Sequence, residues 1–489
     1  MRGRQKGSTM QGIAWTHRQR ECVEFPGPQL LVSGPPGTGK TLVLLKRAVQ
    51  LSHLMPHGRV LVVTFNKALA HYARDQLRLN GAEANTSAVH FHSWAFRQLR
   101  DLGLHLHVIP EPDRRLLLRQ VVETLTPSGS SLLTRPLDWW RDEVDWIKGN
   151  ALSAWERYRQ VERTGRGHGL QLGARQLVWA VYEGYQQQLQ ARGQVDYRDF
   201  ALLLLRAWTP IPDAARVSHL LIDEAQDFRY AELRVLTQLP RQSLTVVADR
   251  TQKIYTTAFA WRDLGFDVRG GGRAKLLTKS YRTTRQIALL AASLRQHDPL
   301  VRPGDPDWVE AELPDREGPL PVVVAARDDR HEAELVLRLV THLQATRPGQ
   351  TLGILARTWE TLHRLEPALR AQSLPYDYLR EQAGAVSTPG IKLTTFHSAK
   401  GLEFGDVLLI GLSEGLFPPP FGRVLDTAEG EQEDDLLSTE RRLLYVAMTR
   451  SRHALYLVAG RQPTRFLAEL DPALYTRTAP ELSPVAAGV

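Results

Sequence analysis

The chain has 489 residues, of which 43% are hydrophobic and 24% are charged, and this composition is typical of a folded globular protein. No run of about 18 apolar residues occurs, and the basic N-terminus lacks the apolar stretch of a signal peptide, so we expect a cytoplasmic protein with no membrane partner. A single cysteine, Cys22, excludes an internal disulfide and a cysteine-cluster metal site. The net charge of +9 is compatible with a polyanionic partner, but arginine-rich surfaces also occur without one, so charge alone leaves both interpretations open.

A glycine-rich loop, GPPGTGKT, occupies residues 34–41 and has the form G-x-x-x-x-G-K-[ST], in which backbone N–H groups surround phosphates. The apolar run 29–33 before it predicts a buried strand, and the pattern of 42–54 after it predicts a helix. Phosphate binding needs this order of strand, loop and helix N-terminus. In such a loop Lys40 neutralises the β- and γ-phosphate oxygens, and Thr41 can hold Mg²⁺. The sequence therefore predicts a nucleotide site formed by Gly34, Pro35, Pro36, Gly37, Thr38, Gly39, Lys40 and Thr41.

A helical insertion is predicted after the loop, because the stretch that follows is longer than a simple run of strand–helix units requires. Amphipathic patterns predict helices at 139–161 and 174–193, with the glycine-rich break 165–169 between them. The insertion is rich in tryptophan, and we interpret these rings as core filling rather than as a platform for stacking bases. Four of them are Trp139, Trp140, Trp146 and Trp155.

A second strand-like run, VSHLLIDEAQDF at 217–228, places two carboxylates, Asp223 and Glu224, at its carboxyl end. Apolar residues that lead to Asp-Glu are what a P-loop fold needs opposite its loop. Asp223 would hold Mg²⁺, and Glu224 would orient and deprotonate a water molecule.

Alternating strands and helices fill the last third of the chain and predict a second parallel sheet with helices on both faces. This region contains no second P-loop. The acidic run 429–435 is interpreted as a solvated loop. The expected strands lie at 320–326, 352–357, 391–396, 406–412 and 454–460, and the expected helices at 329–346, 358–372 and 439–452.

Ten motifs between about residues 15 and 460 closely resemble, in order, those of the UvrD/Rep-like superfamily 1 DNA helicases. They lie at 15–23, 60–70, 89–100, 195–205, 221–227, 246–255, 280–284, 395–404, 414–418 and 440–452. The resemblance implies an α/β fold with two RecA-like parallel-sheet domains in tandem and a helical insertion in the first. The expected first domain comprises 1–95 and 192–275, the insertion 96–191, the second domain 276–475 and a tail 476–489.

The resemblance also implies roles around ATP and Mg²⁺. Gln19 resembles the glutamine that reads adenine, Tyr281 the aromatic ring that stacks on the base, and Glu403 the contact to the ribose. The expected catalytic residues are Lys40, Glu224, the sensor Gln252, and the arginines Arg282 and Arg450, which reach the γ-phosphate from the second domain.

For DNA, the resemblance implies contacts from hydroxyls, imidazoles and aromatic rings, which suit phosphate positioning and base stacking. His92 and His397 could instead be buried structural histidines. The expected contacts are Thr64, Phe65, Asn66, His92, Ser93 and Tyr255 in the first domain and Thr395, His397 and Ser398 in the second.

Three departures from the family pattern stand out. Leu42 replaces the arginine that packs on adenine, and Thr257 stands where a base-stacking tryptophan is usual, which leaves Phe259 or Trp261 as substitutes. The stretch between Arg282 and His397 has no room for the accessory subdomain that larger relatives insert there.

The expected function is an ATP-dependent DNA helicase or translocase that moves 3′→5′ on single-stranded DNA and acts on tailed duplex DNA, with DNA repair among the implied processes. The alternative is an ATP-switched protein that binds or loads onto single-stranded DNA without processive unwinding. An ordinary P-loop kinase would need neither Arg450 nor the nucleic-acid motifs.

Overall fold

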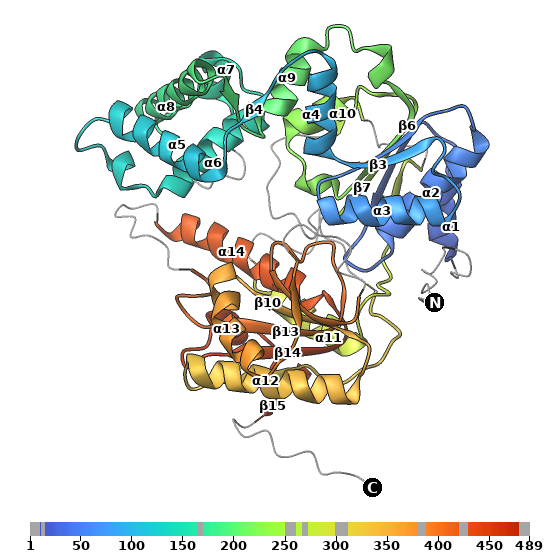
Figure 1. Cartoon of the computed structure of the whole chain (residues 1–489), viewed down its shortest axis with the longest axis vertical. Coiled ribbons are helices and arrows are strands. Elements are labelled where there is room, and N and C mark those ends of the chain that lie inside the picture. Colours follow the sequence, from blue (N-terminus) through green and yellow to red (C-terminus); the bar gives the residue numbers. More distant parts are fainter. Residues whose placement is uncertain are drawn as a thin grey trace.

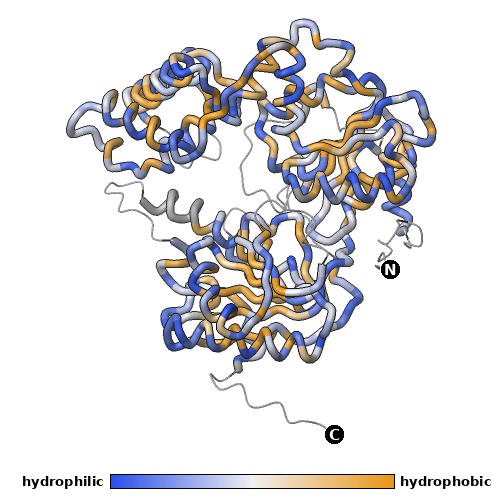
Figure 2. Tube along the Cα trace, viewed as in Figure 1, coloured by the Kyte–Doolittle hydropathy of each residue, from blue (hydrophilic) through white to orange (hydrophobic). Residues whose placement is uncertain are grey.

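The computed structural model describes residues 10, 15–163, 170–249, 261–266, 272–298, 312–379, 388–419 and 429–478, without the side chains of 68, 261, 262 and 429–436. These residues form two lobes, each built on a parallel sheet, and a helical body attached to the first lobe (Figure 1). Hydrophobic residues concentrate along the strands inside each lobe (Figure 2). No helix in the described ranges is long and apolar enough to span a membrane.

The sheet of the first lobe has the strand order β3-β2-β6-β7-β1-β8, and all its pairings are parallel. Because parallel strands end at the same edge of a sheet, the P-loop after β1 and Asp223 at the end of β6 come to one edge. In register, Thr64 pairs with Asp223 and Ser33 with Ala248. The strands are β1 (Gln29–Ser33), β2 (Val60–Thr64), β3 (Thr86–His90), β6 (Val217–Asp223), β7 (Pro240–Ala248) and β8 (Ala274–Leu276).

Helices cover both faces of this sheet, and alternate residues of one strand enter opposite cores. Val63 of β2 packs with Phe91 and Phe228 on one face, while Val62 packs with Leu44 on the other. The helices are α1 (His17–Val23), α2 (Lys40–Leu54), α3 (Lys67–Leu79), α4 (Phe91–Asp101), α9 (Asp199–Ala207) and α10 (Tyr230–Leu236), with short 3₁₀ turns η2 (Asp213–Ala215), η3 (Ala225–Asp227) and η5 (Trp261–Leu264).

The helical body has its own core, which extends from Ile109 to Leu189, whereas α4 packs in the core of the first lobe. We therefore place the start of the insertion after α4. A short parallel pair, β4 (His107–Val108) with β5 (Gln194–Val195), forms its neck. The body comprises α5 (Glu111–Leu125), η1 (Ser131–Thr134), α6 (Leu137–Gly149), α7 (Trp155–Gln160) and α8 (Leu172–Ala191).

The tryptophans of the insertion are core residues, as the sequence predicts. Trp140 and Trp146 are buried, and Trp139 and Trp155 are partly buried against the same cluster. The single helix expected at 139–161 is wrong, because α6 ends at residue 149 in a Schellman motif. Ala151 adopts a φ of 52°, its N–H bonds to Lys148 O at 3.0 Å, and the next N–H bonds to Ile147 O at 3.1 Å.

The second lobe contains a seven-stranded parallel sheet with the order β11-β12-β10-β13-β14-β9-β15. The five expected strands are all present, and two short edge strands, β11 and β15, add to them; β15 extends the sheet past residue 475. The strands are β9 (Val322–Ala325), β10 (Thr351–Ala356), β11 (Tyr376–Tyr378), β12 (Gly390–Thr395), β13 (Phe404–Leu412), β14 (Ser451–Ala459) and β15 (Thr476–Thr478).

The helices of the second lobe follow the expected pattern with one correction. Residues 429–435, expected as a solvated loop, form the first turns of α14. Carboxylates near a helix N-terminus interact favourably with the helix dipole, so an acidic run is compatible with helix there. The helices are α11 (Arg285–Arg295), α12 (Asp329–Thr346), α13 (Trp359–Ala371) and α14 (Glu429–Met448), with 3₁₀ turns η7 (Arg465–Leu467) and η8 (Pro472–Leu474).

Candidate active site

The P-loop lies between β1 and the N-terminus of α2, as the sequence predicts. Lys40 is buried in the loop, where its Nζ donates to Gly34 O at 2.7 Å and Pro35 O at 2.8 Å. The same ammonium lies 3.3 Å from a carboxylate oxygen of Asp249, directly after β7. The Lys40 ammonium is therefore held against the loop, where the phosphates of a nucleotide would bind.

Sequence reasoning did not single out Asp249 as a site residue. It follows the apolar strand β7 as Asp223 follows β6, and β7 lies between β6 and β1 in the sheet. That repeated pattern of a buried strand ending in aspartate is the signal that could have found it.

Two carboxylates lie at the carboxyl end of strand β6, and one of them contacts the hydroxyl of Thr41 in the P-loop. Asp223 is buried and hydrogen-bonds to the Thr41 side chain and, at 3.0 Å, to the Glu224 N–H. Burial, and next the Glu224 carboxylate, raise the pKa of Asp223. Two protein oxygens from Thr41 and Asp223 suit Mg²⁺, which usually takes its remaining ligands from phosphates and water. No cluster of three or more metal-binding side chains occurs in the described ranges, so the protein builds no cage of its own there.

Glu224 is held in a strained backbone conformation, with φ 51° and ψ 44°. Non-glycine residues in this left-handed region cluster at functional sites. The Gln226 side chain donates to the Glu224 carboxylate and accepts from the Asp249 N–H at 2.9 Å. Gln226 thus fixes the predicted base relative to the aspartate beside Lys40.

Two arginines approach this centre from the second lobe. Arg282 Nε donates to Glu403 Oε1 at 2.7 Å, so the predicted γ-phosphate contact and ribose contact lie together. Burial would raise the pKa of Glu403, but the Arg282 charge outweighs it and lowers that pKa. A Cβ added to Gly37 would lie 2.6 Å from Arg282 Cβ, and Gly37 has a φ of 80°, so only glycine allows this close approach of the two lobes.

Arg450 is 1% exposed and has a free donor. Its Nε donates to Val446 O at 2.9 Å and its Nη1 to Leu402 O at 3.4 Å. Its Nη2 has no hydrogen-bond partner among the described residues. Burial, and next Arg282, lower the pKa of Arg450 to about 9, with Glu224 and Glu403 acting in the opposite direction. A buried guanidinium with an unpaired N–H beside these carboxylates fits a phosphate oxygen.

The base-binding residues flank the P-loop. Gln19 on α1 is buried, and its Nε2 donates to Thr38 O at 3.1 Å. Tyr281 is 50% exposed, and its N–H bonds to Gly37 O at 2.8 Å, so its ring is available beside the loop. Leu42, which replaces an arginine in the family pattern, is half-buried on α2.

A buried ion pair that sequence reasoning missed joins the lobes. Lys400 of the second lobe contacts the carboxylate of Asp227, four residues after Asp223, and its carbonyl accepts from Asn66 at 3.3 Å. Burial would lower the pKa of Lys400, but Asp227 and next Glu224 outweigh it and raise that pKa. A Cβ on Gly401, where φ is 81°, would lie 2.8 Å from Leu69 Cδ1 of the first lobe.

The predicted DNA contacts of the first lobe follow β2 and β3. Thr64 is buried at the end of β2, and Phe65 makes edge contacts with His92 and Phe228, with ring centroids 6.1 and 5.6 Å apart. The His92 side chain is only 13% exposed, and burial, and next Arg198, lower its pKa to about 3. His92 is therefore a neutral, largely packed imidazole, while Ser93 is exposed.

The predicted DNA contacts of the second lobe form one turn after β12. Thr395 Oγ1 bonds to Ser398 Oγ at 3.0 Å and accepts from the Ser398 N–H at 3.2 Å. His397, between them, is exposed. Lys400 follows in the same turn, so the DNA residues and the ion pair to the first lobe share one short segment.

Four residues named from the sequence lie outside the described residues: Gln252, Tyr255, Thr257 and Phe259. Trp261 begins η5, but its side chain is also outside them. Apart from connecting segments, the described residues between Arg282 and His397 form strands and helices of the second sheet and its cover.

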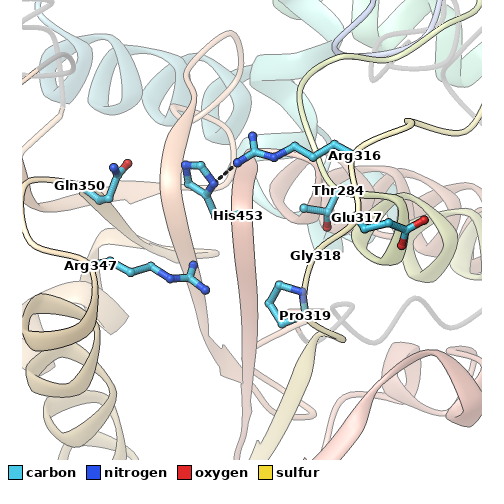
Figure 3. A pocket seen from close by; sticks show the side chains of 8 residues that line it. All are labelled: Thr284, Arg316, Glu317, Gly318, Pro319, Arg347, Gln350 and His453. Atoms are coloured by element: carbon cyan, nitrogen blue, oxygen red, sulfur yellow. Dashed lines mark hydrogen bonds between the residues drawn. The ribbon is translucent and has the colours of Figure 1, made fainter.

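A hollow of about 310 Å³ lies elsewhere in the second lobe (Figure 3). Arg316 and His453 face each other across it and are hydrogen-bonded. Arg347, which also lines the hollow, pairs with Asp406. None of the site residues named above lines it.

The fold, with a P-loop in the first lobe and Arg282 and Arg450 of the second lobe close to it, is that of a P-loop ATPase. Comparison with known proteins narrows the class: residues 15–263 match the UvrD/REP helicase N-terminal domain, and residues 378–462 match the UvrD-like helicase C-terminal domain. The chain therefore belongs to the UvrD/REP helicase family, and it is a helicase enzyme.

Individual relatives agree with this assignment. The chain is 28% identical to the ATP-dependent DNA helicase UvrD2 of Mycobacterium tuberculosis, over 93% of this chain and 81% of that protein. It is 28% identical to DNA helicase II of Escherichia coli over 73% of this chain, which corresponds to half of the relative's length. A shorter match, 41% identical over 20% of this chain and 13% of the relative, is to the ATP-dependent DNA helicase PcrA of Leuconostoc citreum.

Proposed function

We propose that this protein is an ATP-dependent DNA helicase that moves 3′→5′ along single-stranded DNA and separates the strands of tailed duplexes. The observation that carries the proposal is the buried Arg450, whose Nη2 has no hydrogen-bond partner among the described residues and whose charge interacts with those of Glu224 and Asp249 beside the P-loop. An enzyme that completes its ATP site with cations from a second lobe hydrolyses ATP only when the lobes close.

The proposed mechanism assigns a task to each residue of the cleft. The P-loop N–H groups and Lys40 hold the β- and γ-phosphates, and Thr41 and Asp223 would hold Mg²⁺, which supplies charge neutralisation for the phosphoryl oxygens. Glu224 takes a proton from the attacking water, and its strained backbone and the hydrogen bond from Gln226 to its carboxylate aim it there. Arg282 and Arg450 stabilise the charge on the transferred phosphoryl group.

Movement follows from where the DNA contacts lie. The first-lobe contacts follow β2, and the second-lobe contacts follow β12, each at the carboxyl edge of its sheet. Closing and opening of the lobes around ATP would therefore change the distance between the two sets of contacts on one DNA strand. Stacking of a base on Phe65 is worth about 1–3 kcal/mol, comparable with one base-pair step, so stepping by one base is energetically reasonable.

The catalytic assignment is tested by ATP hydrolysis with and without single-stranded DNA. Lys40→Ala and Glu224→Gln are each expected to abolish the DNA-stimulated activity, because one removes the phosphate-binding cation and the other the base. Glu224→Gln should still bind ATP, since its side chain keeps the same shape. Retention of stimulated hydrolysis by either variant would reject the site.

A protein that grips DNA in an ATP-dependent manner without moving is the alternative. Displacement of streptavidin from biotinylated ends of single strands separates the two. A protein that moves 3′→5′ displaces streptavidin preferentially from the 5′ end. A protein that only binds DNA in an ATP-dependent manner displaces it from neither end.

A further inference from the structure

A buried cation, Arg47, lies seven residues after the P-loop lysine on the same helix, α2. It is 2% exposed. Its Nε donates to Thr245 Oγ1 at 2.9 Å, and its Nη1 donates to Val23 O at 2.8 Å and Cys22 O at 3.3 Å. None of the carboxylates in the described ranges pairs with it. All three acceptors are therefore neutral groups.

The two carbonyls explain why a charge is tolerated at this position. Val23 and the residue before it end helix α1, and the carbonyl end of a helix carries partial negative charge. Burial lowers the pKa of Arg47 to about 10, so it stays charged at neutral pH. A buried charge without a counter-ion is costly, and this one is directed at the C-terminus of α1.

The other end of α1 is attached to the P-loop through Gln19. Its Nε2 donates to Thr38 O at 3.1 Å, and its Oε1 accepts from the Thr16 N–H at 3.1 Å. A Cβ on Gly39 would lie 2.9 Å from that Nε2, so the fit is close. α1 has only seven residues, and a helix this short is not stable by itself. Its position therefore depends on its contacts with neighbouring elements, which include these two attachments and the ion pair of Glu21 with Lys275.

The remaining hydrogen-bonding capacity of Gln19 matches adenine. With one N–H and one lone pair used, its amide still has one donor and one acceptor. Adenine presents an N7 acceptor next to an N6 donor, whereas guanine presents two acceptors. A displaced or rotating Gln19 would lose this distinction.

We propose that Arg47 is a positioning residue that fixes α1, and with it Gln19, relative to the P-loop, and thereby sets the preference for ATP over GTP. The inference rests on the proposed nucleotide site but not on movement along DNA.

The test measures dissociation constants for ATP and GTP with the full chain in the absence of DNA. Arg47→Met is expected to weaken ATP binding about tenfold, the size expected for loss of hydrogen bonds from a charged donor. It should leave the dissociation constant for GTP unchanged. Gln19→Ala should lose the same preference, and the double variant should lose no more, because both act through one contact. Arg47→Lys keeps the positive charge but cannot make all of the guanidinium's hydrogen bonds. It should lose only part of the preference for ATP over GTP. Arg78→Met, an exposed arginine on α3, is the matched control.

An ATP-to-GTP ratio that stays at the wild-type value in both Arg47 variants would overturn the inference. Equal weakening of ATP binding and GTP binding would also overturn it, since that result indicates a merely structural role. So would a loss of ATP preference in the double variant that equals the sum of the losses in Arg47→Met and Gln19→Ala. A wild-type protein that binds ATP but unwinds no duplex refutes the proposed function and leaves this inference standing.

Discussion

Arg450 is the residue on which the ATP chemistry depends most. Helix α14 ends two residues before it, β14 begins directly after it, and two backbone carbonyls direct its guanidinium. Its third nitrogen has no partner in the described part of the chain. A donor fixed in this way costs little reorganisation when a phosphate arrives.

Arg450→Ala is predicted to lower the DNA-stimulated kcat by about 10³- to 10⁵-fold, as for other arginines supplied in trans to a P-loop. The KM for ATP should change far less, because the contact strengthens in the transition state. Arg364→Ala, an exposed arginine on α13, serves as the control and should keep the wild-type rate. A kcat within a factor of three of wild type would remove Arg450 from the mechanism.

Individual residues were predictable from the sequence only where a local motif contains them. Lys40, Asp223 and Glu224 belong to short patterns with a physical reason for each position. Lys400 and Arg47 could not be found in this way, because their partners lie 173 and 24 or more residues away in sequence. Nothing local distinguishes a lysine or arginine that will be buried against such a partner from one on the surface.

At the scale of elements, the neck of the helical insertion contains a buried charge network. Lys148 of α6 is fully buried and lies 2.7 Å from Asp196 and 2.8 Å from Asp199, which follow β5. Burial would raise the pKa of Asp196, but Lys148 and next Arg114 outweigh it and lower that pKa. The network therefore joins the insertion to the strand that leads back into the first lobe.

Lys148→Met is predicted to reduce the free energy of unfolding of the first lobe and its insertion by about 3–5 kcal/mol, because the buried Asp199 loses its counter-ion and Asp196 keeps only Arg114. Urea denaturation measures this change. Arg115→Met, which breaks the exposed pair with Asp138, should change it by no more than about 1 kcal/mol. Similar values for the two variants would show that the buried network contributes no more than a surface pair.

Most elements could be predicted from periodicity, and the exceptions have physical causes. The helix expected at 139–161 breaks because Ala151 adopts a left-handed conformation that the apolar pattern does not reveal. The edge strands β11 and β15 were missed because three residues are too few to show alternation. The acidic run 429–435 by its charge predicts a solvated loop, and the helical pattern that follows it does not reveal that α14 begins within this run.

At the scale of the whole molecule, the two lobes meet at the nucleotide cleft and at the buried pair of Lys400 and Asp227. Lys400 lies three residues after His397 of the predicted DNA turn, and Asp227 lies three residues after the predicted base Glu224. The pair is therefore a direct physical connection between the predicted DNA contacts of one lobe and the predicted base of the other. The order of motifs predicted two lobes but not this connection.

A double-mutant cycle tests the connection. Lys400→Met and Asp227→Asn are each predicted to weaken the stimulation of ATP hydrolysis by single-stranded DNA, and the double variant should be no worse than the more severe single one. The expected interaction energy is about 0.5–3 kcal/mol. The control is Lys392→Met, which breaks the pair of the buried Lys392 with the half-exposed Asp377 inside the second lobe. Additive losses would show that the pair does not couple the lobes.

Unwinding of duplexes with a single-stranded tail on either the 3′ or the 5′ end tests the central claim most directly, because it measures ATP-driven motion and its direction together. The account predicts that ATP supports unwinding of the 3′-tailed duplex and leaves the 5′-tailed duplex intact. Preference for the 5′ tail, or equal unwinding without ATP, would contradict it.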